Sequence, residues 1–208
     1  MIIGVIQASS QAAKNELIYG SVNAHAAGCN VINFGCTPDE ENKYSYIEIS
    51  ILIGLLLSSK AVDFIVTGCS SGQGMMLACN NMPGVLCGYC PTPKDAYLFA
   101  QINNGNAVSL PLGEEYTWNG FENMDQTIAK LFSEPFGQGY PKNEAARKLE
   151  DTRLLKAIRN DSQVSMTDLL KKLDKPLLDK ILNKNNVLEY IIKNGKDREI
   201  AAFLTNFF

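Results

Sequence analysis

The first two thirds of the chain alternate short apolar runs, rich in β-branched residues, with longer segments of helical periodicity. The short runs predict β-strands at 2–6, 30–34, 62–67, 85–89 and 107–110. A helix is predicted after each strand, at 10–27, around 49–57, and at 72–80, 93–103 and 119–132. Five strand–helix units in series favour a parallel sheet covered on both faces. We therefore expect a three-layer α/β/α, Rossmann-like domain.

The last third of the chain has a different pattern. From about residue 143 to residue 208, apolar and charged residues alternate at helical spacing. Ser165 with Asp168 three residues later is a helix start signal, and Pro176 suits the first turn of another helix. This part predicts a small bundle of short helices. Glycine and proline are dense just before it, so we place the α/β domain at 1–136, a connecting loop at 137–142 and a helical extension at 143–208.

Charge is divided at the same place. Residues 1–135 hold 5 Lys and Arg against 12 Asp and Glu, a net charge of −7, whereas residues 136–208 hold 14 against 10, a net charge of +4. The whole chain carries 19 − 22 = −3, so no global basic field favours nucleic acid or an anionic membrane as a partner. The positive face of the extension fits either a solvated surface or a docking surface for the acidic domain.

Membrane insertion and secretion are not expected. The longest apolar run, 49–57, is far shorter than the roughly 20 residues that cross a bilayer. The N-terminus reads as a strand and lacks the basic segment of a secretory signal. The six cysteines lie mostly in apolar runs without a repeated spacing, as suits reduced thiols. We therefore expect a cytoplasmic protein without disulfides.

The richest candidate chemistry is the segment 63–75, an apolar strand that ends in Cys69-Ser-Ser-Gly-Gln-Gly-Met75 and enters a helix. Small residues there allow backbone N–H groups and a helix N-terminus to converge on an anionic oxygen. Cys69 lies at the entrance, where the positive helix end favours its thiolate, so it is a candidate base or nucleophile. The alternative is a tight strand–helix turn with an ordinary half-buried cysteine.

Three other chemistries are weaker. The G-x-S-x-G pattern at 68–72 fits the nucleophile elbow of α/β hydrolases, but that mechanism needs a downstream histidine, and the single histidine, His25, lies upstream. Cys87-x-x-Cys90 lacks a second cysteine pair and falls on a predicted strand, which disfavours zinc and thioredoxin-like chemistry. A flavin or nucleotide is disfavoured because no glycine signature for its phosphates occurs. We expect neither a metal nor a cofactor.

At the Cys69 loop the chain resembles the aldose–ketose isomerase family of ribose-5-phosphate isomerase B and galactose-6-phosphate isomerase. The resemblance spans about 1–142 and rests on three motifs in the family's order and spacing. The family's Cys-Gly-Thr-Gly-x-Gly-Met loop matches 69–75, its Ala-Asn-Lys-x-Pro-Gly run matches 79–84, and its His-Asn-Asp-x-Asn-Val run matches 102–107. The resemblance implies an isomerase that moves a proton between C1 and C2 through an enediol or enediolate.

The resemblance also implies site residues. Cys69 takes the position of the base, Ser71 takes that of the family's loop threonine, and the backbone around Gly72 and Gly74 would stabilise the enediolate oxygen. Asn103 matches an asparagine that reaches the site of the partner subunit in the family. A homodimer with shared sites, or a tetramer built from it, is therefore implied. The expected substrate-binding residues are Gln7, Ser9, Tyr46, Ser70, Gly72, Gln73, Gly74, Asn103 and Lys142, with Tyr46 near the tyrosine of the family's Asp-Tyr-Pro motif.

The chain also departs from the family pattern. The family's ring-opening histidine is Ile102 here, its Asp-His pair after the first strand is Gln-Ala at 7–8, and one phosphate-binding arginine is Leu86. The family's C-terminal Gly-Gly-Arg-His is replaced at 139–142. An acid is needed to open a cyclic sugar, so its loss suggests an open-chain substrate. Fewer arginines weaken the case for a phosphate, although Lys142 can still hold one phosphate or carboxylate charge.

The Tyr-Pro-Lys loop and the helical extension resemble a longer subgroup of the family, in which some members isomerise acyclic 4-deoxy-5-keto-hexuronates. Small ketose phosphates such as tetrulose phosphates are also acyclic and remain open as substrates. Two classes of function follow. One is a metal-free aldose–ketose isomerase with Cys69 as its base, and the other is a non-catalytic carbohydrate-binding or assembly subunit on the same scaffold. The retention of Cys69 favours the enzyme.

Overall fold

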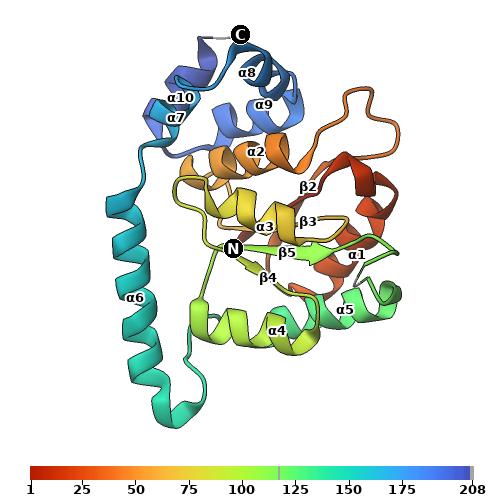
Figure 1. Ribbon diagram of the computed structural model, residues 1–208, viewed down its shortest axis with the longest axis vertical. Helices are drawn as coiled ribbons and strands as arrows, with labels where there is room; N and C mark the ends of the chain where they lie inside the picture. The colour runs from red at the N-terminus through yellow and green to blue at the C-terminus, as the bar shows by residue number, and fades with distance from the viewer. Residues whose placement is uncertain (117, 207–208) are drawn as a thin grey trace.

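Residues 1–116 and 118–206 are described by the computed structural model of the chain. Within them a five-stranded parallel sheet forms the centre of the molecule, in the order β2-β1-β3-β5-β4 (Figure 1). The strands are β1 Ile2–Ile6, β2 Asn30–Gly35, β3 Phe64–Cys69, β4 Cys87–Tyr89 and β5 Ala107–Pro111. Because neighbouring strands are parallel, their carboxyl ends meet along one edge of the sheet. The α/β fold expected from the hydrophobic pattern is confirmed.

Helices cover both faces of the sheet. One layer holds α2 Tyr46–Ser58 and α3 Gln73–Asn80, and the other holds α1 Asn15–His25, α4 Pro93–Leu98 and α5 Gly120–Leu131 (Figure 1). Successive strand residues point to opposite faces. In β3, Ile65 therefore joins the core beneath α2, while Phe64 and Val66 join the core beneath α1 and α5. A sheet buried on both faces explains the continuous apolar runs of its strands.

The apolar run 49–57 forms most of α2. This helix begins with a capping box, in which the Ser45 side chain accepts a backbone N–H of the first turn and the Glu48 carboxylate accepts the N–H of Ser45 at 2.7 Å. Residues 49–57 are all buried, because α2 lies between the sheet and the C-terminal helices (Figure 1). A helix covered on two sides has no need of a polar face.

The third strand begins at Phe64, two residues later than predicted. Val62 is buried in the turn after α2, where its N–H donates to the Leu56 carbonyl at 3.3 Å. Asp63 then joins the first strand through its N–H, which donates to the Ile2 carbonyl at 2.8 Å. The apolar character of Val62 therefore reflects core packing, which periodicity does not distinguish from strand pairing.

Two predicted helices are subdivided in the structure. The segment predicted at 10–27 starts as a 3₁₀-helix, Ser9–Lys14, before α1 begins. The segment predicted at 93–103 consists of α4 followed by a π-helical turn, η2 Phe99–Asn103. The 3₁₀ turn keeps its first residues close to the end of β1, at the carboxyl edge of the sheet.

The chain beyond α5 is helical. It forms η3 Lys142–Glu144, α6 Ala145–Ser162, α7 Met166–Leu170, α8 Lys175–Leu182, α9 Asn185–Asn194 and α10 Arg198–Thr205. The helix start predicted at Ser165 is confirmed, because its hydroxyl accepts the Asp168 N–H at 3.1 Å. Helices α7 to α10 pack over α2 and share its core through Leu170, Ile181 and Leu188.

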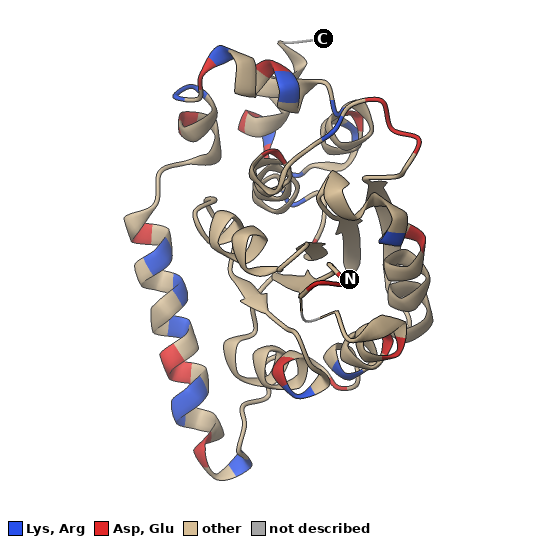
Figure 2. Ribbon diagram, turned by 45° about the vertical axis from the view of Figure 1, so that its right-hand side comes forward, with Lys and Arg blue, Asp and Glu red and all other residues tan. Residues whose placement is uncertain are grey.

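Helix α6 stands apart from this bundle and runs along the side of the molecule (Figure 1). Figure 2 shows positive and negative residues along its whole length, in contrast to the uncharged strands and α3. Of its residues, Thr152 alone is buried. No helix in the described part of the chain is both long enough and apolar enough to cross a membrane.

Candidate active site

A cavity of about 380 Å³ opens at the carboxyl edge of the sheet, where the ends of β1 and β3 meet the N-termini of α2 and α3. In open α/β sheets this edge holds ligands, above all where the strand order reverses. Here the order reverses between β1 and β3. The cavity is lined by Ala8, Ser10, Tyr44, Ser45, Tyr46, Cys69, Ser70, Ser71, Gly74 and Tyr116.

Cys69 is the last residue of β3 and lines this cavity. Its carbonyl accepts the N–H of Leu112 at 3.0 Å, and its backbone pairs with Pro111 of β5. The residue is 7% exposed, and its thiol is free. Because the sheet holds its backbone on one side, the position of the thiol is set by a rigid element.

The turn after Cys69 is held tightly against β5. Gly72 has a φ of +75°, and a Cβ there would lie 2.8 Å from the backbone of Leu110 and Pro111. Ser109 donates its hydroxyl to the Gly72 carbonyl at 2.6 Å. This turn starts α3, whose first N–H groups have no acceptor within the helix. These N–H groups and the helix dipole offer a site for an anionic oxygen beside Cys69.

The opposite wall consists of the residues that lead into α2. Burial, together with the negative charge of Glu40, raises the pKa of Tyr44 to about 12, so its phenol stays protonated at neutral pH. Tyr46 is 42% exposed, and its ring lies 3.6 Å from where a Cβ of Gly74 would be. The N-termini of α2 and α3 therefore approach each other closely across the cavity.

The structure brings together many of the residues singled out from the sequence. Those that line the cavity are Tyr46, Cys69, Ser70, Ser71 and Gly74. Gly72 lies beneath them in the turn, and Gln73 is exposed as the first residue of α3. Ser9 does not line the cavity but contacts the lining residue Tyr44, because its hydroxyl accepts the Tyr44 N–H at 2.8 Å.

Gln7 lies in a different environment from the one expected. It is fully buried, and its amide donates to the Cys36 carbonyl at 2.6 Å while its Oε1 accepts from Asn15 at 2.9 Å. It does not line the cavity. Its hydrogen bonds join the ends of β1 and β2, and burial of its amide is balanced by these partners.

Asn103 and Lys142 lie at the other edge of the sheet. Asn103 ends η2, four residues before β5 begins, whereas Cys69 pairs with the last residue of β5. Lys142 follows a segment whose N–H groups, at Gly137 and Gly139, each donate to a carbonyl of η2 at 2.9 Å. Both side chains are exposed. Within one chain they do not meet Cys69.

Five lining residues were not singled out from the sequence: Ala8, Ser10, Tyr44, Ser45 and Tyr116. Ala8 and Ser10 follow the end of β1 by two and four residues, and Tyr116 follows the end of β5 by five. Their nearness to the carboxyl ends of strands is the signal that could have found them. Tyr44 and Ser45 belong to a loop that returns to the cavity ten residues after β2 ends, and no local pattern indicates that return.

Among the described residues, those that line the cavity include no histidine, lysine or arginine. His25, the single histidine of the chain, lies between α1 and α5 with its Nε2 3.1 Å from Asp125. Lys14 donates to the Leu112 carbonyl and lies 4.2 Å from the centre of the Trp118 ring. These basic groups have partners outside the cavity.

The other cysteines do not form a second site. Burial raises the pKa of the Cys90 thiol, and burial with the neighbouring Cys79 raises that of Cys87, so both stay protonated. All six cysteines are free. Within residues 1–116 and 118–206, no group of three or more His, Cys, Asp or Glu side chains is placed to hold a metal ion.

The fold and this site have known relatives. A model of the Ribose/Galactose Isomerase family matches residues 3–149. A crystal structure of a 4-deoxy-L-threo-5-hexosulose-uronate ketol-isomerase complexed with a tartrate is 37% identical, with a TM-score of 0.92, over 99% of this chain and 98% of that one. A crystal structure of a ribose-5-phosphate isomerase from Vibrio parahaemolyticus is 36% identical, with a TM-score of 0.92, over 100% of this chain and 99% of that one.

More distant structures share the fold. A type B ribose 5-phosphate isomerase from Trypanosoma cruzi is 23% identical, with a TM-score of 0.61, over 76% of this chain and 99% of that one. Curated protein sequences contain no significant match. The family model covers well over half of the chain, and the resemblance inferred from the three motifs is confirmed. This chain therefore belongs to the Ribose/Galactose Isomerase family and is a sugar isomerase, an intramolecular oxidoreductase.

Proposed function

We propose that the chain isomerises an open-chain keto sugar acid of the 4-deoxy-5-keto-hexuronate class, with Cys69 as the base. The observation that carries this proposal is a cysteine in the lining of a cavity whose described lining residues include no histidine. A cyclic sugar needs an acid to protonate its ring oxygen, and an open-chain substrate does not. The 37% identical structure is a ketol-isomerase of such a uronate, which supports this substrate class.

The proposed reaction balances without a cofactor. The Cys69 thiolate takes the proton from C2 of the aldose, and the same thiol returns a proton to C1, while one proton passes from the oxygen on C2 to the oxygen on C1. We assign the relay of that second proton to the Ser71 hydroxyl, because Ser71 lines the same cavity as Cys69. The N–H groups at the start of α3 stabilise the enediolate oxygen, which needs such donors to form at a useful rate. All six cysteines are free, as suits a reducing compartment, so we assign this activity to the cytoplasm.

A small ketose phosphate is the second candidate substrate. The 36% identical structure is a ribose-5-phosphate isomerase, which favours a phosphorylated substrate. Either substrate carries an anionic end, and the described lining of the cavity contains no cation to hold it. We propose that a second copy of the chain supplies Lys142 for this charge, together with Asn103.

Helix α6 supports an assembly of two copies. Thr152 and Lys156 turn toward the body of the molecule, donating to the carbonyls of Ile102 at 2.7 Å and Asn104 at 2.6 Å. Three large apolar side chains of the same helix, those of Leu154, Leu155 and Ile158, make no such contact and are exposed to 45%, 43% and 65%. Exposed apolar side chains gathered on a charged helix indicate an interface. This helix lies beside η2, so a partner bound there lies near Asn103.

Proton exchange tests the proposed function. We would incubate the protein in D₂O with 4-deoxy-5-keto-hexuronate, small ketose phosphates and their aldose isomers, and follow deuterium next to the carbonyl by NMR. Uptake from one substrate class, lost in Cys69→Ala and kept in Cys29→Ala, is the expected result. Cys29 is the matched control because its thiol is outside the cavity and half-buried. Ligand binding without any exchange would favour the non-catalytic carbohydrate-binding subunit.

A further inference from the structure

We propose that Lys184, at the start of α9, is a positioning residue for the active site, because it holds the loop at 36–45 that carries Tyr44 and Ser45 into the Cys69 cavity. The proposal rests on the proposed function of that cavity. It gives the C-terminal helices a role in catalysis, although they contribute no side chain to the lining of the cavity.

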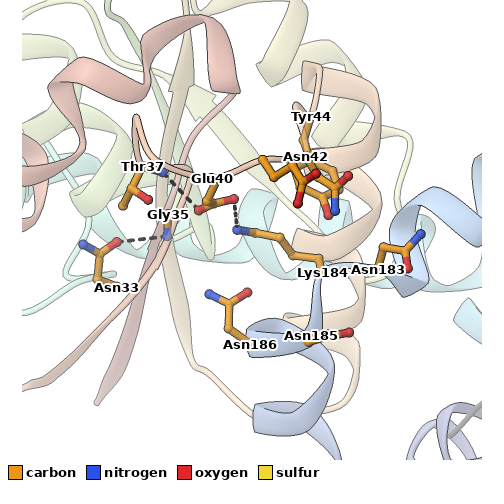
Figure 3. A pocket seen from close by; sticks show the side chains of 11 residues that line it. Asn33, Gly35, Thr37, Glu40, Asn42, Tyr44, Asn183, Lys184, Asn185 and Asn186 are labelled. Atoms are coloured by element: carbon orange, nitrogen blue, oxygen red, sulfur yellow. Dashed lines mark hydrogen bonds and ion pairs between the residues drawn. The ribbon is translucent and has the colours of Figure 1, made fainter.

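Lys184 forms a buried ion pair with the loop. It is 4% exposed, and its Nζ lies 2.5 Å from Oε2 of Glu40 (Figure 3). The other carboxylate oxygen of Glu40 accepts the N–H of Thr37 at 3.0 Å (Figure 3). A buried ammonium group is unfavourable unless it is paired, so the ion pair sets the distance between α9 and the loop.

The ion pair lies directly against the wall of the active site. The Nζ of Lys184 is 5.4 Å from the centre of the Tyr44 ring, within the range of a cation–π contact. Tyr44 lines both the Cys69 cavity and a second cavity of about 440 Å³, which lies between the loop and the turn from α8 to α9 (Figure 3). A shift of Lys184 therefore reaches the substrate cavity through a single side chain.

Two further contacts hold the ends of the same segment. Lys180 lies 2.7 Å from Oε1 of Glu48, whose other oxygen accepts the Ser45 N–H at the start of α2. Asn186 donates its amide to the Phe34 carbonyl at 3.2 Å, at the end of β2. Helices α8 and α9 thus hold both ends of the segment that connects β2 to α2, and Lys184, in the turn between these helices, holds its middle.

The loop also leaves room for the ion pair. Gly35 has a φ of +90°, and a Cβ there would collide with the Glu40 carboxylate and lie 3.2 Å from Nζ of Lys184. Glycine is the residue that adopts this conformation without strain and without a side chain. The start of the loop is therefore shaped around the buried charges.

The test compares Lys184→Met with the control Lys175→Met. Lys175 is on the same group of helices, is exposed, and pairs with Asp179 within its own helix at 2.9 Å. Hydrogen–deuterium exchange of a peptide covering 36–46 reports the order of the loop, and steady-state kinetics report kcat and KM. In Lys184→Met we expect faster exchange in this peptide, a raised KM and a kcat/KM lower by about tenfold or more.

The readouts separate positioning from stability. A variant that is merely less stable lowers the active fraction and the apparent kcat while KM stays the same, and that result would overturn the proposal. If hydrogen–deuterium exchange in the 36–46 peptide of Lys184→Met is unchanged, the positioning role is contradicted, whatever the kinetics show. Faster exchange in that peptide with unchanged kcat and KM would also contradict the positioning role. The double variant Lys184→Met/Glu40→Gln leaves no unpaired buried charge and serves as the test if Lys184→Met does not fold.

The two proposals fail in different ways. A wild-type protein that incorporates no deuterium into any substrate contradicts the proposed function. In that case the exchange rates of the 36–46 peptide still decide whether Lys184 orders the loop. An active wild type, with Lys184→Met indistinguishable from Lys175→Met, contradicts the positioning role alone.

Discussion

Ser9 and Tyr44, 35 residues apart in the chain, are joined by two hydrogen bonds. The Ser9 N–H donates to the Tyr44 carbonyl at 2.9 Å, and the Tyr44 N–H donates to the Ser9 hydroxyl at 2.8 Å. The pair connects the turn after β1 to the loop before α2, and both of these segments line the Cys69 cavity. The shape of the cavity therefore depends on a contact between two loops.

Replacing Ser9 with alanine removes the acceptor of the Tyr44 N–H. We expect Ser9→Ala to lower the free energy of unfolding by about 1–3 kcal/mol, since a buried donor is left without a partner, and to raise KM. Urea unfolding and initial rates measure the two effects. Ser133→Ala is the control, because its hydroxyl bonds a carbonyl at an exposed helix end. Equal stability of the two variants would show that the Ser9 hydroxyl is dispensable.

Gly72 and Gly28 provide a matched pair for the turn before α3. Both have positive φ, +75° and +74°, but a Cβ at Gly72 meets the backbone of β5 whereas a Cβ at Gly28 has no neighbour within 4 Å. We expect Gly28→Ala to cost about 1 kcal/mol of stability and Gly72→Ala about 2 kcal/mol or more, with loss of proton exchange in Gly72→Ala alone. Urea unfolding and the NMR assay check this. Equal losses would refute the close approach of the turn to β5.

The Glu48 carboxylate makes stability depend on pH. Burial raises its pKa, but hydrogen bonds from Lys180 and Ser45 outweigh burial and hold the pKa below its usual value. Because the folded pKa is lower than the unfolded one, the stabilisation is present above the unfolded pKa of about 4.3 and is lost as the pH falls toward the folded value.

Glu48→Gln should therefore reduce the difference in unfolding free energy between about pH 7 and about pH 4. Glu122→Gln, at an exposed residue whose carboxylate bonds Gln126, should leave that difference nearly unchanged. Urea unfolding at the two pH values is the measurement. An identical pH dependence in Glu48→Gln and in the wild type would mean that the cap and the ion pair contribute no net stabilisation.

The exposed Leu154, Leu155 and Ile158 of α6 form the proposed interface between two copies of the chain. Ile158→Glu places a charge in the proposed interface, so we expect it to shift the protein from dimer to monomer in sedimentation velocity. We also expect it to reduce proton exchange, because the proposed function draws Lys142 and Asn103 from a second copy. Leu17→Glu is the control, since Leu17 is 43% exposed on α1, away from α6. A monomeric wild type, or a dimeric Ile158→Glu, would contradict the interface.

Parts of the fold could be predicted from local signals. The strand ends were predicted to within one residue, except that β3 was placed two residues early at both ends and β4 was started two residues early. Alternating and continuous apolar runs record burial directly, which is why this worked. The helix starts at Ser165 and near Pro176 could be predicted because the capping residues and the proline that mark them lie within one turn of each start. The division of 93–103 into an α-helix and a π-helical turn could not be predicted, because the two kinds of helix have similar periodicity.

Part of the candidate site could likewise be predicted from local sequence, and part could not. Cys69 and its small neighbours are adjacent in sequence, and the turn they form needs glycine at a positive φ, so a reader of the sequence can find them. Gln7 was expected at the substrate but is buried in a hydrogen-bond network, because its partners at Asn15 and Cys36 depend on how β1 and β2 pair.

The sequence alone determined the order of the strands and helices, the parallel sheet, and the place of Cys69 at a strand end, because each follows from periodicity or from the backbone freedom of glycine. Only the tertiary structure decided that Tyr44 forms the opposite wall and that Lys184 pairs with Glu40, 144 residues away. Such contacts depend on the docking of the C-terminal helices against α2. Docking is driven by burial of apolar area, which has no direction of its own, so local patterns do not specify which polar groups it brings together.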